Sequence, residues 1–431
     1  MVGTPRAASL ADEAVQIGHR LAASALRQNG LATWLTDEYA CDGATWCRAT
    51  GTLDGNVGMG TAGVGLFLAQ LAVHTQHTRI TEAALDAIRH GLARVDAMLA
   101  ASRYGWFDGA LGVTDAATLI ADLLDRDDVR LIAADRRMQT LTAMQQAQFP
   151  QDTGLLHGTA GILTGLIAAS RHLRSTAGQD AATVLLTRVA SVVSSDAARG
   201  DVTPARPATG LAQGNSGIAL PLFALAPESG LPPEVLTSSI NAAVTALDAE
   251  RQCMQPGYGW WCDSPHAWYP WDSEARLGSN GGWCAGAAGI GITRLIAYRR
   301  VGEARFLAEG AAAIQVVRDA LVEESADSDA SLCHGWAGMI ESLSFASSML
   351  REPALLDVAR TVATERLAAN RVGQGYGSGL WPGAQNPSLL FGLAGVGLTL
   401  LRLYDPTCAV TPALPRCLYD QQSGANATRL T

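Results

Sequence analysis

Two cysteines occupy the same place in two copies of one short motif, and a histidine follows the second cysteine. The copies read Trp-Cys-Ala-Gly-Ala-Ala-Gly at 283–289 and Leu-Cys-His-Gly-Trp-Ala-Gly at 332–338. Two thiolates and an imidazole form a soft sulfur and nitrogen donor set that suits zinc. Three protein ligands leave a fourth position for substrate or water, as in catalytic zinc sites. The motif therefore predicts a catalytic zinc site at Cys284, Cys333 and His334.

The motif that positions these residues recurs along the chain. Each copy is a Gly-x-small-Gly turn followed by an apolar run typical of a helix. Successive first glycines lie 49, 49, 56, 72, 49 and 57 residues apart, and such self-similarity marks a repeat architecture. The seven copies begin at Gly60, Gly109, Gly158, Gly214, Gly286, Gly335 and Gly392.

A second, amphipathic stretch lies between successive turns, so each repeat reads as a pair of helices, and alternating strand patterns are scarce. Apolar inner helices with polar outer partners favour a closed, all-α toroid over an open array, because closure removes the exposed ends. We therefore expect one α/α toroid domain over 1–404. It would carry an aromatic-rich insertion at about 253–282 and a partly disordered tail at 405–431.

Composition excludes several functions. The net charge of −9 argues against nucleic-acid binding, and the 31 basic residues are all arginine, which excludes chemistry that needs lysine. No apolar run reaches the roughly 20 residues that span a bilayer, so an integral membrane protein is not expected. The first residues lack the apolar core of a signal peptide, and the eight cysteines are expected to be reduced thiols. We expect a cytoplasmic protein.

From about residue 50 to 404 the chain resembles the LanC-like lanthionine cyclase family, on the seven turns, the Trp-Cys-x-Gly motif and the Cys-His-Gly motif. The resemblance implies an α/α toroid around one zinc ion, with Cys284, Cys333 and His334 as its ligands. It also implies an enzyme that adds a cysteine thiol of a precursor peptide to dehydroalanine or dehydrobutyrine, forming thioether rings. The partners would be a peptide with a leader and a dehydrated core, and a separate dehydratase or kinase-lyase system.

Four positions depart from the family's pattern. The family's acid-base histidine, aspartate, tyrosine and arginine are replaced here by Gln213, Gly154, Ala285 and Asn280 respectively. The metal motif is thus kept while the residues expected to handle protons are absent.

The repeat register suggests substitutes for them. The position just before the first glycine holds His334 in the sixth repeat, and it holds Asp108 and His157 in the second and third. We hypothesise that His157 serves as the general acid-base and that Asp108, or nearby Asp152, orients it.

Alternatives remain at this stage. His157 could instead have a purely structural role at the rim, and three residues of the aromatic insertion are rival proton donors: Asp263, His266 and Arg276. The chain could also add a small thiol to dehydroamino acids, or act as a zinc-stabilised peptide-binding scaffold without catalysis. A glycosidase or terpenoid cyclase rests on fold analogy alone, and no paired carboxylates support a glycosidase.

Overall fold

A computed structural model of the chain describes most of its residues. The described ranges are 5–41, 46–173, 176–199, 209–225, 230–255, 259–260, 281–323, 329–370, 376–378, 380–381, 383–411 and 414–419.

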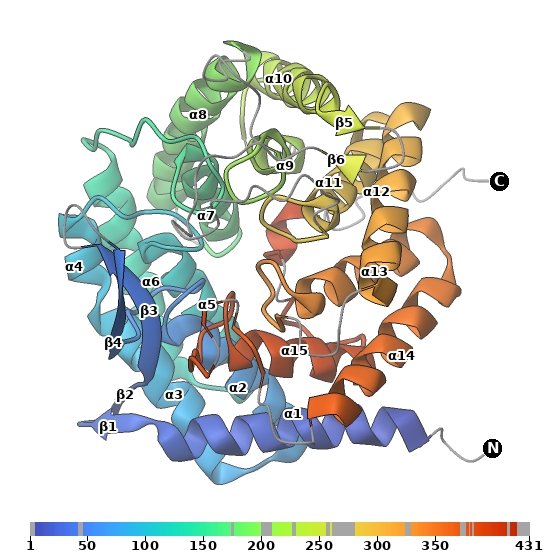
Figure 1. Cartoon of the computed structure of the whole chain (residues 1–431). Coiled ribbons are helices and arrows are strands. Elements are labelled where there is room, and N and C mark those ends of the chain that lie inside the picture. The colour runs from blue at the N-terminus through green and yellow to red at the C-terminus, as the bar shows by residue number, and fades with distance from the viewer. Residues whose placement is uncertain are drawn as a thin grey trace.

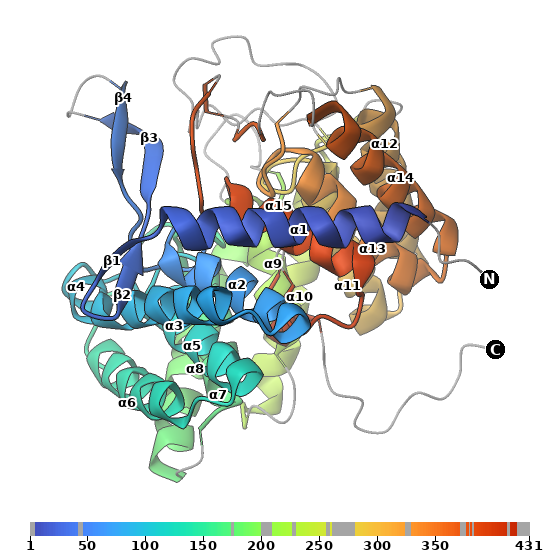
Figure 2. The same cartoon turned by 90° about the horizontal axis from the view of Figure 1, so that it is seen from below.

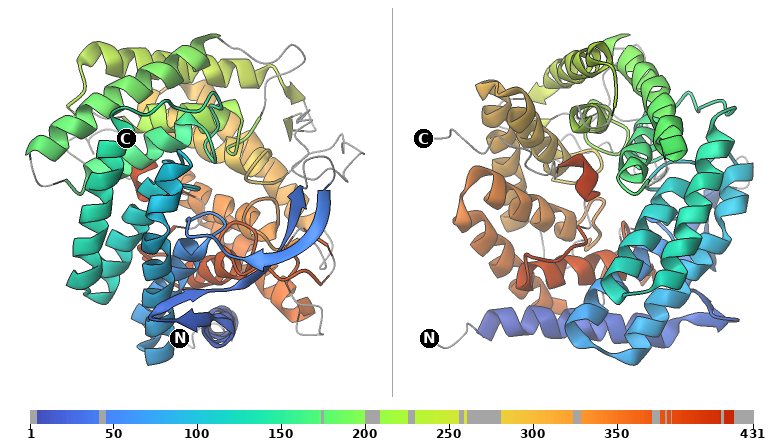
Figure 3. Two further views of the ribbon diagram at one scale, coloured as in Figure 1. Left: turned by 90° about the vertical axis from the view of Figure 1, so that its left-hand side faces the viewer. Right: turned by 180° about the vertical axis from the view of Figure 1, so that it is seen from behind.

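Helices form two concentric rings, which are seen end-on in Figure 1 and from behind in Figure 3. The inner ring consists of α2 (Thr61–Thr75), α5 (Ala110–Leu124), α7 (Thr159–Ser170), α9 (Asn215–Ala224), α11 (Ala287–Val301), α13 (Trp336–Leu350) and α15 (Leu393–Tyr404). The outer ring consists of α1 (Pro5–Ser24), α3 (Thr78–Ala93), α6 (Asp127–Met144), α8 (Thr176–Arg199), α10 (Pro233–Arg251), α12 (Ala304–Glu323) and α14 (Pro353–Asn370). A short helix, α4 (Val95–Ala100), follows α3.

Hydrophobic patterning separates the two rings. The inner helix α2 is buried without interruption from Thr61 to Ala72, as expected for a helix that is apolar on all sides. Its outer partner α3 buries one stripe, which includes Ile80, Ala84 and Ile88, and exposes its polar face. The inner ring is therefore the core of the molecule, and the outer ring covers it.

The second glycine of the repeated turn is required by close backbone approach. In all seven repeats a Cβ at this glycine would lie only 1.6 to 2.3 Å from the carbonyl oxygen six residues earlier. Gly112, facing the carbonyl of Trp106, is the tightest case at 1.6 Å. Any larger residue would push the inner helix away from the turn that precedes it. The first glycine of each turn is the extended N-cap of the inner helix.

Backbone hydrogen bonds connect the turns of neighbouring repeats. In six of the seven junctions, the residue two before the first glycine donates its N–H to the carbonyl of its counterpart in the next repeat. The bond between Leu390 and Gly58, at 2.9 Å, joins the seventh repeat to the first and closes the ring. The donor-acceptor pairs are Gly58–Phe107, Leu156–Ala212, Ala212–Cys284, Cys284–Cys333, Cys333–Leu390 and Leu390–Gly58.

The N-terminal helix completes the outer ring, which sequence analysis did not predict. The chain ends its seventh repeat on the inner helix α15, so no later outer helix covers it within the described residues. Helix α1 packs against α15 instead. Figures 1 and 2 show it running along the edge of the ring beside α2 and α14.

Strands add to this helical body. Hairpins are formed by β1 (Leu26–Gln28) with β2 (Leu31–Thr33), by β3 (Leu35–Cys41) with β4 (Trp46–Thr52) and by β5 (Met254–Gln255) with β6 (Gly259–Trp260). The β3–β4 hairpin projects beyond the helices (Figure 2). Asp37 of β3 and Gln385 exchange two hydrogen bonds of 2.8 Å, which tie the hairpin to the segment leading into α15.

The C-terminal segment packs on the ring as far as it is described. Cys408, Leu414, Cys417 and Leu418 are buried, and a 3-10 turn, η2, spans Arg416–Leu418. Residues 412–413 and 420–431 of the predicted tail, and most of the aromatic insertion, lie outside the described residues.

Candidate metal centre and acid-base pair

The two cysteines meet because their turns are adjacent in the ring. Cys284 precedes α11 and Cys333 precedes α13, and the Cys284 N–H donates to the Cys333 carbonyl at 2.9 Å. The two thiol sulfurs and a ring nitrogen of His334 all lie within 4.8 Å of one another. The structure thus brings together the three residues that the motif predicted as metal ligands.

Asp329 fixes the orientation of the histidine. Its Oδ2 lies 2.9 Å from Nε2 of His334, which makes Nδ1 the ring nitrogen available as a ligand atom. Asp329 is itself held by the backbone N–H of Ser331, at 2.8 Å, and by the Ser331 hydroxyl, at 2.9 Å. Phe391 of the next repeat packs on the imidazole, with ring centroids 5.6 Å apart. Metal-binding histidines are typically oriented by such carboxylates.

The cluster is polarised to hold positive charge. The hydrogen bond from Cys333, helped by His334, lowers the pKa of Cys284 to about 5 despite burial. The same hydrogen bond raises the pKa of Cys333, which acts as its donor. Burial opposes the charge on His334, but Asp329 and Cys284 outweigh it and raise the pKa of His334 to about 10. The Cys284 sulfur and the Asp329 carboxylate therefore favour a positive charge between them, at the position of the imidazole.

This donor set fits a metal ion. Zinc prefers sulfur and nitrogen ligands, and a histidine whose second nitrogen pairs with a carboxylate is the usual arrangement in its sites. Cys333 is 4% exposed, whereas Cys284 and His334 are partly accessible, so the cluster can be reached from one side. The three residues could bind a metal ion.

Asp108 and His157 also meet. Nδ1 of His157 lies 3.2 Å from Oδ2 of Asp108, which joins the turns of the third and second repeats. Their side chains are 25% and 12% exposed respectively, so the pair is partly shielded from water. Because a carboxylate only accepts, this contact places the hydrogen on Nδ1 and turns Nε2 away from Asp108.

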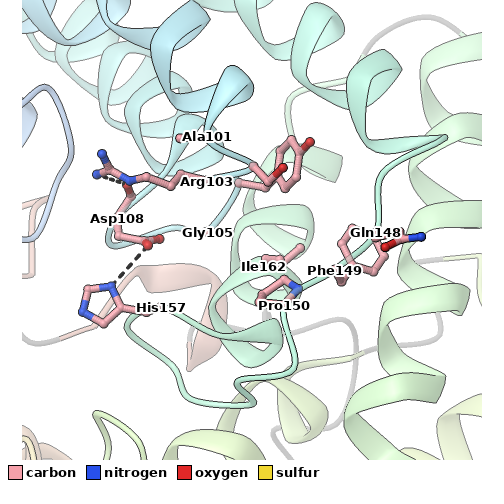
Figure 4. Close-up of a pocket in the computed structure, with 11 residues that line it drawn as sticks. Ala101, Arg103, Gly105, Asp108, Gln148, Phe149, Pro150, His157 and Ile162 are labelled. Atoms are coloured by element: carbon pink, nitrogen blue, oxygen red, sulfur yellow. Dashed lines mark hydrogen bonds and ion pairs between the residues drawn. The ribbon is translucent and has the colours of Figure 1, made fainter. Parts of the chain in front are cut away.

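An arginine holds the turn that carries Asp108. Arg103 donates to the Asp108 carbonyl at 2.5 Å and to Oδ2 of Asp54, in the first repeat, at 2.7 Å. A cavity of about 280 Å³ opens beside the pair, lined by Asp108 and His157 together with Arg103, Phe149 and Ile162 (Figure 4).

An aromatic contact connects the turn of Asp108 with the turn of Cys284 across the ring. Phe107 directly precedes Asp108, and Trp283 directly precedes Cys284. Their ring centroids lie 5.7 Å apart, and both side chains are buried. The Asp108 turn and the Cys284 turn therefore flank one packed centre, although they belong to the second and fifth repeats.

Other candidates have different surroundings. Asp152 accepts a hydrogen bond from the backbone N–H of Gly154 at 2.8 Å and so caps its own turn, while Asp108 is the carboxylate that contacts His157. The Ala285 carbonyl accepts from the Thr209 hydroxyl at 3.2 Å. Asp263, His266, Arg276 and Asn280 lie outside the described residues.

Sequence analysis missed Asp329. The repeat register contains a signal for it, because an Asp or Asn stands six residues before the first glycine in five of the seven repeats. In the third, sixth and seventh repeats these residues accept a hydrogen bond from the backbone two residues later. Asp152 and Asp329 are each followed by a histidine five residues on. In the sixth repeat the turn carboxylate also reaches that imidazole, whereas His157 of the third repeat contacts Asp108. The five residues are Asp54, Asp152, Asn280, Asp329 and Asn386.

The double ring of helices defines an α/α toroid. A Cys-Cys-His cluster precedes the N-termini of two inner helices and could hold a metal ion. Residues 51–418 match the family of lanthionine synthetase C-like proteins, and the chain belongs to this family. Its fold is similar to that of nisin cyclase, with a TM-score of 0.62 at 16% sequence identity over 84% of this chain and 91% of that chain. These findings confirm the predicted family and toroid. A sequence search of curated proteins gives no match.

In the described part of the chain, no helix is both long enough and apolar enough to cross a membrane.

Proposed function

We propose that this protein is a zinc-dependent cyclase that adds a cysteine thiol to a dehydroalanine or dehydrobutyrine of a ribosomally made precursor peptide. The observation that carries the proposal is the Cys284, Cys333 and His334 cluster, whose ligand atoms lie within 4.8 Å of one another. Membership of the lanthionine synthetase C-like family supports it. The peptide would arrive already dehydrated by a separate dehydratase or kinase-lyase system.

Cys284, Cys333 and His334 would hold the zinc ion, and Asp329 would orient the imidazole. When bound, zinc supplies the charge that keeps a peptide thiol deprotonated at neutral pH, where a free thiol of pKa about 8.5 is mostly protonated. Partial access to Cys284 and His334 leaves an approach for the peptide.

His157 and Asp108 would handle the protons. The peptide sulfur attacks the β-carbon of the dehydroamino acid, a C–S bond forms, and the alkene electrons move to the α-carbon and its carbonyl as an enolate. His157 Nε2 would take up the thiol proton and deliver it to the α-carbon. Asp108 would hold Nδ1 protonated through the 3.2 Å contact and would stabilise the imidazolium while it carries both protons.

Two further features support this assignment. The Phe107–Trp283 contact places the Asp108 turn and the Cys284 turn around one centre, as a shared substrate would require. The cavity beside His157 offers room for peptide side chains next to the proton donor. His157 and Asp108 would thus replace the proton-handling residues that Gln213 and Gly154 no longer supply.

The test is incubation of the zinc-loaded chain with a dehydrated, cysteine-containing peptide, followed by thiol alkylation and mass spectrometry. Cyclisation leaves the peptide mass unchanged and protects its thiol from alkylation. Reaction with an added small thiol would instead raise the mass, and an unprotected, unchanged peptide would indicate a binding scaffold. Either of these last two results overturns the proposal.

Variants separate the metal from the proton donor. Replacement of His157 by Ala is expected to slow cyclisation about 10²-fold or more while zinc content stays at the wild-type level. The matched control is His172→Ala, because His172 also pairs with an aspartate, Asp115, at 3.2 Å but at the far end of α7. Full cyclisation by the His157→Ala variant would contradict the assigned role.

A further inference from the structure

A second cluster of metal-ligating side chains lies where the ring closes. His74 is in the last turn of α2, Asp405 follows the end of α15, and Cys408 lies three residues further on. Their ligand atoms all fall within 4.8 Å of one another. Because α2 and α15 both begin at the glycine turns, this cluster lies at the opposite end of the inner helices from Cys284 and Cys333.

Two contacts fix the orientation of the His74 imidazole. Its Nδ1 lies 2.9 Å from the Gln70 carbonyl oxygen. A carbonyl only accepts, so Nδ1 carries a hydrogen, and Nε2 is the ring nitrogen left to face the solvent side of the cluster. Nε2 lies 2.8 Å from Oδ2 of Asp405. A ring nitrogen and a carboxylate oxygen that could both bind a metal ion therefore face each other.

The surrounding backbone holds the cluster in place. Oδ1 of Asp405 accepts from the N–H and hydroxyl of Thr407, at 2.9 and 2.6 Å, which directs Oδ2 towards His74. The Gln70 side chain accepts from the Val410 N–H at 3.1 Å and anchors the segment that carries Cys408. Cys408 is 2% exposed, while the His74 and Asp405 side chains remain 21% and 29% exposed. Solvent therefore reaches the imidazole and the carboxylate, while the thiol is covered.

We propose that His74, Asp405 and Cys408 form a second metal site, which takes zinc or a similar borderline divalent ion and joins the first repeat to the seventh. One nitrogen, one carboxylate oxygen and one sulfur are all ligands that zinc accepts, with the exposed side left for water. The link would cross the junction at which the ring is not covalently continuous. Metal binding there stabilises the closed ring, because the site exists only when both repeats are in place.

The test uses the full-length chain, freed of metal with a chelator and titrated with Co²⁺ alone. We expect two ions per chain, each with sulfur-to-cobalt absorption. Cys408→Ser is expected to remove one ion while cyclisation continues, and Cys333→Ala is expected to remove the other. If replacing the buried Cys408 destabilises the chain, His74→Gln tests the second site instead, because the His74 side chain is accessible. His172→Gln is the matched control. His172 also pairs with an aspartate, Asp115, but among the described residues neither belongs to a group that could hold a metal ion.

The outcomes for the two sites are distinguishable. In the Cys333→Ala chain, Zn²⁺ should raise the thermal midpoint, and the added Cys408→Ser change should abolish that rise. A wild-type chain that binds one ion, lost on Cys333→Ala and retained on Cys408→Ser and His74→Gln, would overturn the second site without affecting the proposed cyclase. Loss of cyclisation with two ions still bound would overturn the cyclase alone.

Discussion

The Asp108→Asn variant tests the acid-base pair with little change in shape. The replaced carboxylate accepts from Nδ1 of His157 at 3.2 Å, and the two side chains are 12% and 25% exposed. A hydrogen bond to a charged group contributes about 1.5–3 kcal/mol, and each 1.4 kcal/mol is a factor of ten in rate. The contact is at the long end of hydrogen-bond distances and is partly solvated, so we expect cyclisation to slow about tenfold to a hundredfold.

Two measurements distinguish loss of the imidazole's orientation from loss of the folded zinc site. Single-turnover cyclisation, followed by thiol alkylation and mass spectrometry, gives the rate, and zinc content should stay at the wild-type value. In ¹⁵N spectra of the zinc-loaded chain, the hydrogen of His157 should no longer be confined to Nδ1, because an asparagine amide can donate as well as accept. Asp115→Asn, which alters the His172 pair, should leave the rate unchanged. A wild-type rate for Asp108→Asn would refute the role of Asp108.

Four further predictions concern backbone and charged groups, most of them near the site. Gly210 has a φ of +86°, and a Cβ there would lie 2.5 Å from the Cys284 carbonyl oxygen, so Gly210→Ala should weaken zinc binding in an equilibrium titration. Gly302→Ala, at a φ of +80° with open space, should cost only about 1 kcal/mol of unfolding free energy and leave zinc binding intact. Glu250 pairs with fully buried Arg294 at 3.0 Å, so Glu250→Ala should cost about 3 kcal/mol in urea unfolding, and a cost below about 1 kcal/mol would contradict this. Asp329→Asn should weaken zinc affinity about 10- to 100-fold, and unchanged affinity would exclude its orienting role.

Most of what the sequence could predict came from the repeat register, that is, from equivalent positions in the seven repeats. It identified the seven inner helices and predicted that Asp108 and His157, 49 residues apart, occupy neighbouring positions, and the structure places them in contact. It likewise aligned Cys284 with Cys333, whose turns are hydrogen-bonded to each other. Register works here because every turn must approach its own helix closely through the second glycine, which keeps the turns equivalent.

Other features are set by contacts that no local pattern records. Helix α1 lies outside the repeat, and its place beside α15 follows from the need to cover the last inner helix. The β3–β4 hairpin depends on pairing across its turn and on contacts with Gln385, more than 300 residues away. The cluster of His74, Asp405 and Cys408 likewise forms only when the two ends of the repeat array meet.

Zinc-edge X-ray absorption of the Cys408→Ser chain, which should hold a single ion, tests the central claim most directly. The account predicts two sulfur neighbours and one imidazole nitrogen, from Cys284, Cys333 and His334, and a third sulfur neighbour when a cysteine-containing dehydrated peptide is added. A zinc ion whose sulfur count does not change with the peptide, or a chain that binds no zinc, would contradict it.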